Sequence, residues 1–204
     1  MFFTIDKHIL FNILLLLVSL SCKNDKIIEI RSANGLLTTR ITVNGDTLMG
    51  KNGLYEYFDT LGNLIESKMY HDNKLDGTRK IYEKGALYSI EQYVNDEFHG
   101  TYQVFYPNGQ LKLEGNYVHN VLTGTLKTYY ENQQIKEIVE MANNEENGPF
   151  VEFHISGTKK AEGTYLNGPN EHGLLQLFDS TGVLIRKMNC DHGICNTIWK
   201  RDSI

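Results

Sequence analysis

The chain has 204 residues, with 20 Lys and Arg against 25 Asp and Glu, which gives a formal charge of −5. This charge argues against nucleic acid as the main partner, because phosphate binding requires concentrated Lys and Arg. Eighteen glycines and twelve tyrosines, with only three prolines, are typical of a β-protein with many tight turns. The length suits one ordinary domain or one repeat array.

An apolar run near the N-terminus predicts a secretory signal peptide over residues 1–21. Residues 9–20, ILFNILLLLVSL, follow Lys7 and His8 and lead into the small residue Ser21. The run is shorter than the roughly 20 apolar residues that a transmembrane helix requires. A buried helix or a signal anchor is the alternative interpretation.

The end of this run resembles a bacterial lipobox. Residues 18–22, VSLSC, place a cysteine where the lipobox cysteine is acylated and becomes the first mature residue, although Ser19 stands where the pattern prefers Leu. The resemblance implies that Cys22 is lipidated, that residues 22–26 form a tether, and that the protein is anchored in the bacterial cell envelope, outside the cytoplasm. Several acyl chains anchor a protein stably where one binds only marginally.

Both ends of the remaining chain are expected to act as caps. Residues 27–52 predict a degenerate hairpin with its turn at Asn34-Gly35, and Arg31 stands where every later copy has an aromatic ring. Terminal repeats are often atypical because they cap an array. Residues 196–204 form the predicted C-terminal tail, in which Trp199 covers the exposed end of the sheet.

A repeat of 23 to 25 residues occupies residues 53–195, and a fixed period of this size indicates an array of similar supersecondary units. Each of the six copies begins with a glycine: Gly53, Gly77, Gly100, Gly124, Gly148 and Gly173. Five residues after it, each copy has an aromatic residue: Phe58, Tyr82, Phe105, Tyr129, Phe153 and Phe178.

The third copy, residues 100–117 with the sequence GTYQVFYPNGQLKLEGNY, is predicted to be one β-hairpin. Two alternating segments rich in β-branched and aromatic residues flank the turn sequence Pro-Asn-Gly. A two-residue loop at Asn108-Gly109, or a four-residue loop, pairs Tyr106 with Leu111. This pairing predicts a polar face with one ring, Phe105, and an apolar face made by Tyr102, Val104, Leu111, Leu113 and Tyr117.

This unit resembles the MORN-repeat variant of bacterial proteins of the YwqK antitoxin type, and the resemblance runs from Gly53 to about Asp191. It implies an all-β fold, an elongated and twisted antiparallel sheet of consecutive hairpins. It also implies a binding or scaffolding role. An antitoxin-like neutralising partner is one form that such a role could take.

The six rings are the candidate binding residues. At about 10 Å of sheet per hairpin, they recur too far apart to stack directly on one another. Stems of Lys and Arg cover them, or they form a stripe that binds a ligand. A protein or peptide partner is the first hypothesis, and an envelope carbohydrate is the second. The departures from the repeat assemble no nucleophile with a base, so we expect neither an enzyme nor a cofactor or metal.

Two cysteines lie near the C-terminus. Once Cys22 is set aside, Cys190 and Cys195 remain as an even pair, which predicts a disulfide in an exported protein. A metal site formed by the two thiols with Asp191 and His192 is the alternative.

Overall fold

The computed structural model describes residues 25–44 and 50–202, and all sixteen strands in these residues belong to one antiparallel sheet. The predicted fold class is therefore confirmed. None of the described residues forms a helix long and apolar enough to cross a membrane. The strands are β1 (Asp25–Arg31), β2 (Leu37–Asn44), β3 (Gly53–Phe58), β4 (Leu64–His71), β5 (Lys74–Glu83), β6 (Ala86–Val94), β7 (Glu97–Phe105), β8 (Leu111–Val118), β9 (Val121–Leu122), β10 (Gly124–Tyr129), β11 (Ile135–Ala142), β12 (Glu145–Phe153), β13 (Lys159–Tyr165), β14 (Gly173–Phe178), β15 (Leu184–Asp191) and β16 (Ile194–Lys200).

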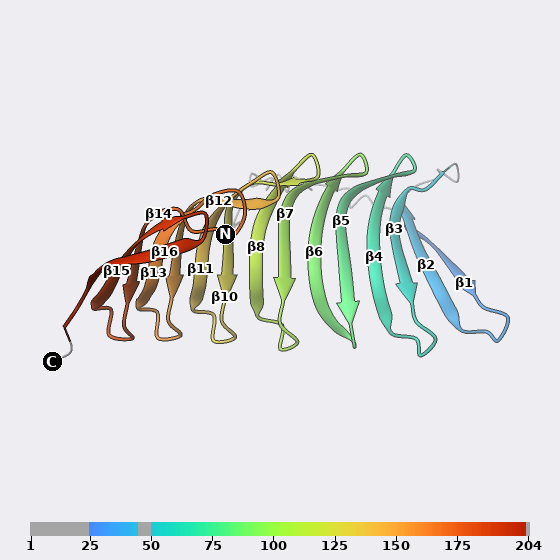
Figure 1. Cartoon of the computed structure of the whole chain (residues 1–204). Coiled ribbons are helices and arrows are strands. Elements are labelled where there is room, and N and C mark those ends of the chain that lie inside the picture. The colour runs from blue at the N-terminus through green and yellow to red at the C-terminus, as the bar shows by residue number, and fades with distance from the viewer. Residues whose placement is uncertain (1–24, 45–49, 203–204) are drawn as a thin grey trace, which may run out of the picture.

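The order of the strands across the sheet is their order in the chain, with the two-residue β9 pairing β8 off this path. Figure 1 shows the result, a row of bowed strands with β1 at one end and β16 at the other. Apart from the place where β8 pairs with both β9 and β10, each strand therefore pairs only with its neighbours in sequence, as in other repeat arrays. Residues 1–21 and Cys22, the predicted signal peptide and lipidation site, lie outside the described residues.

Most turns within the repeats are three-residue loops, and the predicted two- or four-residue loop was wrong. In the third repeat, the Tyr106 N–H donates to Gln110 O and the Gly109 N–H to Tyr106 O, both at 2.8 Å. Within this loop only Gly109 has a positive φ, of 84°. The loop is thus a type I turn completed by a left-handed glycine, a second geometry that Pro-Asn-Gly permits. A bulge follows, so Leu111 pairs with Phe105 instead of Tyr106.

The turns between repeats lie at the opposite ends of the strands from the turns within repeats (Figure 1). They form hydrogen bonds that join each repeat to the preceding one. His119 and Asn120 both have positive φ, 49° and 66°, as a type I′ hairpin turn requires. The Asn120 N–H donates to Phe98 O at 2.9 Å, and Asn120 Oδ1 accepts from the Phe98 N–H at 2.8 Å. The same two bonds join other turns to earlier strands, Asp96 to Leu75 and Asn144 to Leu122.

Most of the best-buried side chains share one side of the sheet, which we call the core face. Its buried residues include Tyr55, Glu91, Val104, Val139, Phe150 and Leu175. No second layer covers this face in residues 25–44 and 50–202. The strands are bowed (Figure 1), and twist and bow of a sheet bring side chains of neighbouring strands closer together on its inner side, which is a means of burying a face without a second layer.

The residues predicted to act as caps lie at the two ends of the sheet. The hairpin β1–β2 begins two residues before the predicted cap of residues 27–52, and its turn is closed by the Ser32 N–H donating to Leu36 O at 2.8 Å. At the other end, the predicted tail of residues 196–204 overlaps β16, which pairs with β15. Trp199 belongs to this edge strand and is 42% exposed.

Candidate binding surface

An aromatic stripe crosses the face opposite the core face. We define it as the six repeat rings together with the residue that pairs with each ring across its hairpin. The pairs are Phe58 with Leu64, Tyr82 with Leu87, Phe105 with Leu111, Tyr129 with Ile135, Phe153 with Lys159, and Phe178 with Leu184. Because paired residues share a face, an aliphatic side chain or a lysine stem stands between successive rings.

The pairing of Leu111 corrects a second prediction. The sequence placed Leu111 on the apolar face with Tyr102, but the bulge moves it to the side of Phe105. Each strand from β3 to β15 other than β9 contributes one residue to the stripe, and all of these residues except Lys159 are aromatic or aliphatic.

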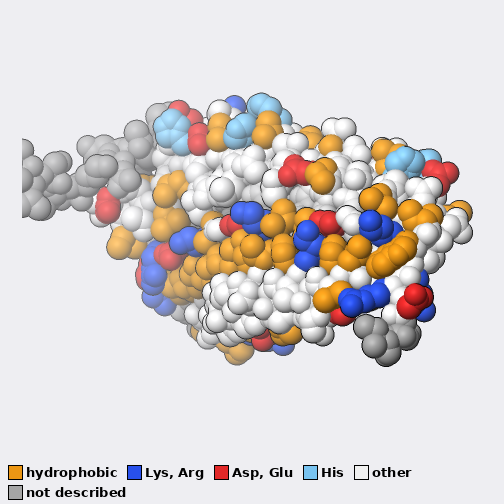
Figure 2. Space-filling view, turned by 90° about the vertical axis from the view of Figure 1, so that its left-hand side faces the viewer, with side chains coloured by type: hydrophobic (Ala, Val, Ile, Leu, Met, Phe, Trp, Pro, Cys, Tyr) orange, Lys and Arg blue, Asp and Glu red, His pale blue; other side chains and the backbone are white. Residues whose placement is uncertain are grey.

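All twelve residues of the stripe are half-buried. Cationic side chains cover two of its rings: Arg40 Cζ lies 5.3 Å from the Phe58 ring centre, and Lys159 Nζ lies 5.4 Å from that of Phe178. Such contacts contribute roughly 0.5–1 kcal/mol at exposed sites. The rings are therefore partly covered by the chain and partly accessible to a partner. Figure 2 shows one side of the molecule, where hydrophobic side chains form a band between charged ones.

Tyr129 differs from the other rings because its hydroxyl has a charged acceptor. The Tyr129 hydroxyl donates to Glu114 Oε1 at 2.7 Å. Burial and this bond together raise the pKa of Tyr129 to about 12. The phenol therefore stays protonated at neutral pH and remains a donor fixed by Glu114. A second tyrosine ties adjacent repeats together, since the Tyr106 hydroxyl donates to Tyr129 O at 2.6 Å.

Two open hollows lie along the stripe, each between neighbouring repeats. One, of about 380 Å³, has Phe105, Tyr88 and Lys112 in its lining. The other, of about 440 Å³, lies between Leu64 and Tyr82. Hollows of a few hundred cubic ångströms lined by aromatic and aliphatic groups accommodate side chains or small ligands. The stripe therefore offers apolar contact along its length and places where a partner's side chains can insert.

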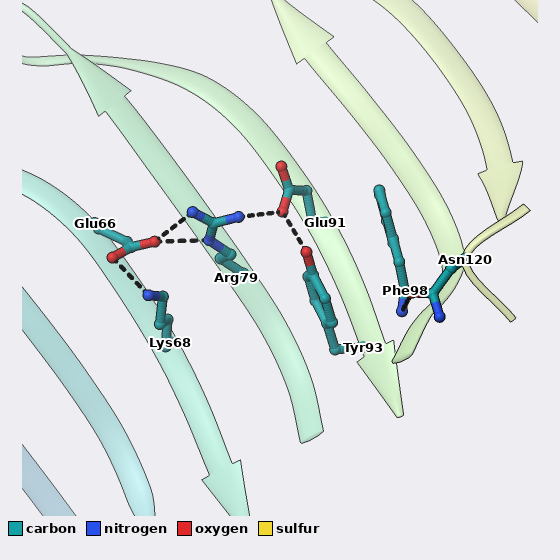
Figure 3. A network of polar contacts seen from close by, with 7 residues as sticks. All are labelled: Glu66, Lys68, Arg79, Glu91, Tyr93, Phe98 and Asn120. Carbon is teal, nitrogen blue, oxygen red and sulfur yellow. Dashed lines mark hydrogen bonds and ion pairs between the residues drawn. The ribbon is translucent and has the colours of Figure 1, made fainter. Parts of the chain in front are cut away.

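A charged network crosses β4, β5 and β6 on the core face (Figure 3). Arg79 donates to Glu66 Oε1 through Nε at 2.7 Å and Nη2 at 2.6 Å, and to Glu91 Oε2 through Nη1 at 3.0 Å. Lys68 Nζ lies 2.8 Å from Glu66 Oε2, and the Tyr93 hydroxyl donates to Glu91 Oε2 at 3.1 Å. Glu91 is only 8% exposed. Burial works against the charge of Arg79, but the two carboxylates raise its pKa above the ordinary value.

A stack of rings stands beside this network. Phe98 lies between Tyr93 and Tyr117, with ring centres 5.1 Å and 3.9 Å away and planes within 12° of parallel. Tyr102 meets Phe98 edge-on at 5.6 Å. Phe98 is also the residue to which Asn120 is hydrogen-bonded, so the ring stack and the turn both stabilise the beginning of β7 (Figure 3). The rings that stack directly thus lie at strand ends on the core face, away from the aromatic stripe.

The two central repeats are similar to a known type of repeat. Residues 98–119 and 122–143 match the family model of the MORN repeat variant. No curated protein matches the chain. The matched repeats contribute Phe105 and Tyr129 to the stripe, and MORN repeats indicate a repeat scaffold.

The predicted cysteine pair lies at the end of the array. Cys190 and Cys195 are joined by a disulfide and face each other across β15 and β16, with their Cα atoms 4.0 Å apart. Cys190 is 3% exposed and packs in the hydrophobic cluster of the C-terminal repeats. While they are bonded to each other, the two thiols are not available as metal ligands, so the metal site considered from the sequence would lose half of its donors.

Sequence reasoning missed the charged network and the way in which four histidines pair at the turn edge. The aligned copies carried both signals. Arg79 occupies the second position after its repeat glycine. The other copies have an apolar residue at this position, for example Phe150 in the fifth copy. His99 and His119 likewise occupy the same two positions of their repeat as a later pair, His172 and His192. Comparing the copies position by position would have revealed these departures.

Proposed function

We propose that the protein is a lipid-anchored, non-catalytic scaffold of MORN repeats that binds a protein or peptide partner at the bacterial cell envelope. The observation that carries this proposal is the aromatic stripe, half-buried and continuous from β3 to β15 on one face of an open sheet. A single-layered sheet offers a long surface, which suits association with a macromolecule. Apolar surface that remains partly accessible along one face is typical of interaction sites.

The composition of the stripe supports a protein or peptide partner. Aromatic residues and Arg are enriched where binding energy concentrates in protein interfaces. The stripe provides such groups at two places on one surface. Arg40 lies over the ring of Phe58, and Phe105 adjoins a hollow. An antitoxin-like neutralising interaction would be one case of such binding.

A photo-crosslinking experiment tests the binding surface in native envelopes. We would place p-benzoylphenylalanine at Phe105 and, as a matched control, at Leu61, a turn residue that is 84% exposed and outside the stripe. The proposal expects a discrete crosslinked protein from position 105 that is absent from position 61. Equal crosslinking from both positions, or none from either, would contradict it.

The anchor is proposed from the lipobox resemblance at Cys22. Cys22→Ser should abolish both fatty-acid labelling of the protein and its retention in the membrane fraction, because the acylated thiol would be missing. Ser21→Ala serves as the control and should leave both unchanged. Full labelling of the Cys22→Ser protein would contradict lipidation at this residue.

An envelope carbohydrate is the second candidate ligand. The specific observation in its favour is that the six rings recur once per repeat and that each remains half-buried. Sugar rings can lie against such faces through apolar contact. Isolated envelope polysaccharide should then bind the protein, and Phe105→Ala should weaken that binding whereas Leu61→Ala should not. Retention of the crosslinked protein partner after polysaccharide removal would favour the first candidate.

A further inference from the structure

Three potential metal ligands lie close together at the turns between repeats, near the C-terminal end of the array. One ligand atom each from His172, Asp191 and His192 lies within 4.8 Å of the other two. Asp191 Oδ1 is 2.7 Å from His192 Nδ1 and 3.4 Å from His172 Nδ1, and the two rings are 5.5 Å apart. Within residues 25–44 and 50–202, this is the one such group of three. Figure 2 shows histidines along the upper edge of the molecule.

The backbone holds these three residues at fixed positions. His192 and Gly193 form a two-residue turn with φ of 48° and 80°, and the Gly193 N–H donates to Glu171 O at 3.0 Å. This bond ties the turn to the residue that precedes His172. The disulfide between Cys190 and Cys195 joins the two strands on either side of the same turn. The site is thus formed by two chain segments that are joined independently of the three side chains.

We infer that His172, Asp191 and His192 form a binding site for a divalent transition metal ion, of which Zn²⁺ is the reference. Two imidazoles and one carboxylate are donors that suit such ions. Ligand atoms around tetrahedral zinc lie about 3.3 Å apart, so rotation of exposed side chains has to close a gap of about 1.5 Å. Three protein ligands leave a fourth position for water or another ligand.

The third repeat contains a matched histidine pair that lacks a carboxylate at the position of Asp191. The His99 and His119 rings lie 5.0 Å apart at the equivalent repeat positions. The residue equivalent to Asp191 is Val118, which offers no ligand atom. Glu97 Oε2 instead approaches His119 Nδ1 at 2.5 Å, from another position of the repeat. Among the described residues, only His172, Asp191 and His192 bring three ligand atoms within 4.8 Å of one another. The chain therefore carries its own comparison between a histidine pair that belongs to a group of three donors and one that does not.

Zinc titration calorimetry of the untagged, chelator-treated full chain tests the inference. We expect one Zn²⁺ to bind the native protein, and His192→Asn and Asp191→Val each to weaken binding at least 10-fold. Asn suits this turn, since Asn143 occupies the equivalent position with φ of 54°. The control His119→Asn should change the affinity less than 2-fold.

Circular dichroism without metal shows whether each variant is folded, so that a loss of binding can be assigned to the lost ligand. The inference is overturned if the native protein binds no Zn²⁺ or if folded His192→Asn protein binds as tightly as the native chain. It is also overturned if His119→Asn weakens binding as much as His192→Asn, because the ion would then be held by exposed histidines in general.

Discussion

The same position of the repeat holds a cation in one copy of the N-terminal half of the sheet and a buried ring in one copy of the C-terminal half. The second residue after the repeat glycine is Arg79 in the second copy and Phe150 in the fifth. Both lie on the core face. Arg79 bridges two carboxylates, whereas Phe150 is 4% exposed and stacks on Tyr165 with ring centres 4.0 Å apart.

The residue that pairs across the hairpin explains how the same backbone accommodates both Arg79 and Phe150. Arg79 pairs with Glu91, which neutralises it, and Phe150 pairs with Gly163. A Cβ on Gly163 would lie 2.9 Å from Phe150 Cε1, so the ring needs a glycine opposite it. The repeat therefore specifies a complementary pair at this position, while the ladder of backbone hydrogen bonds stays the same. The two halves share a fold and differ in what stabilises their core.

Phe150→Ala should give the largest loss of stability, because it empties the centre of the apolar half. Truncating a buried Phe costs about 3–5 kcal/mol. The free energy of unfolding, measured by urea denaturation, should fall by that amount and should depend little on salt. Phe153→Ala, in the half-buried stripe, is the matched control and should lose less than half as much. An equal loss for the two variants would show that the apolar half has no distinct core.

Arg79→Phe should give the next largest loss, of about 2–4 kcal/mol, because it leaves the carboxylate of Glu91 buried without its cation. The double variant Arg79→Phe with Glu91→Gly transplants the pair of the fifth repeat and should be more stable than the single variant. In urea denaturation, the loss in the single variant should shrink in 1 M salt, which screens charges. A double variant less stable than the single one would contradict the idea that the repeat specifies pairs.

The periodic features of the molecule could be predicted because they repeat. Six glycines 23 to 25 residues apart, each followed five residues later by a ring, fix the hairpins and the alignment of the rings, whatever the details of any one turn. The turn itself could not be decided, since Pro-Asn-Gly suits several loops and only the φ values distinguish them. Gln133 shows that the position is set by the fold, because it adopts φ of 67° where other copies have glycine.

The non-periodic features were the ones that sequence patterns left open. An apolar face predicted from the third repeat does not reveal that the second repeat places Arg79 and Glu91 there. The meeting of His172, Asp191 and His192 depends on the bond between neighbouring repeats at Gly193, which no single hairpin contains. Departures from a repeat therefore have to be read in pairs across the sheet, as neighbours in space.

Glu137→Gln should give the smallest change in the free energy of unfolding, and this change should be an increase instead of a loss. Glu137 pairs with Glu152 in the C-terminal half, and burial, then Glu152, then Glu146 raise the pKa of Glu137 above its ordinary 4.5. Ionising a carboxyl group whose pKa is higher in the folded state destabilises the fold, so this group weakens stability as pH rises from about 4.5 through its folded pKa.

Glutamine carries no charge, so the variant should be more stable than the native chain at neutral pH, by less than about 1.5 kcal/mol, and the two should converge below pH 4.5. Thermal unfolding at several pH values measures this difference. Glu131→Gln, which changes an exposed acid, is the control and should show no such trend. A Glu137→Gln protein that is less stable at pH 7 would mean that the carboxylate is held by favourable contacts, as in the charged half, and the contrast between the two halves would fail at this position.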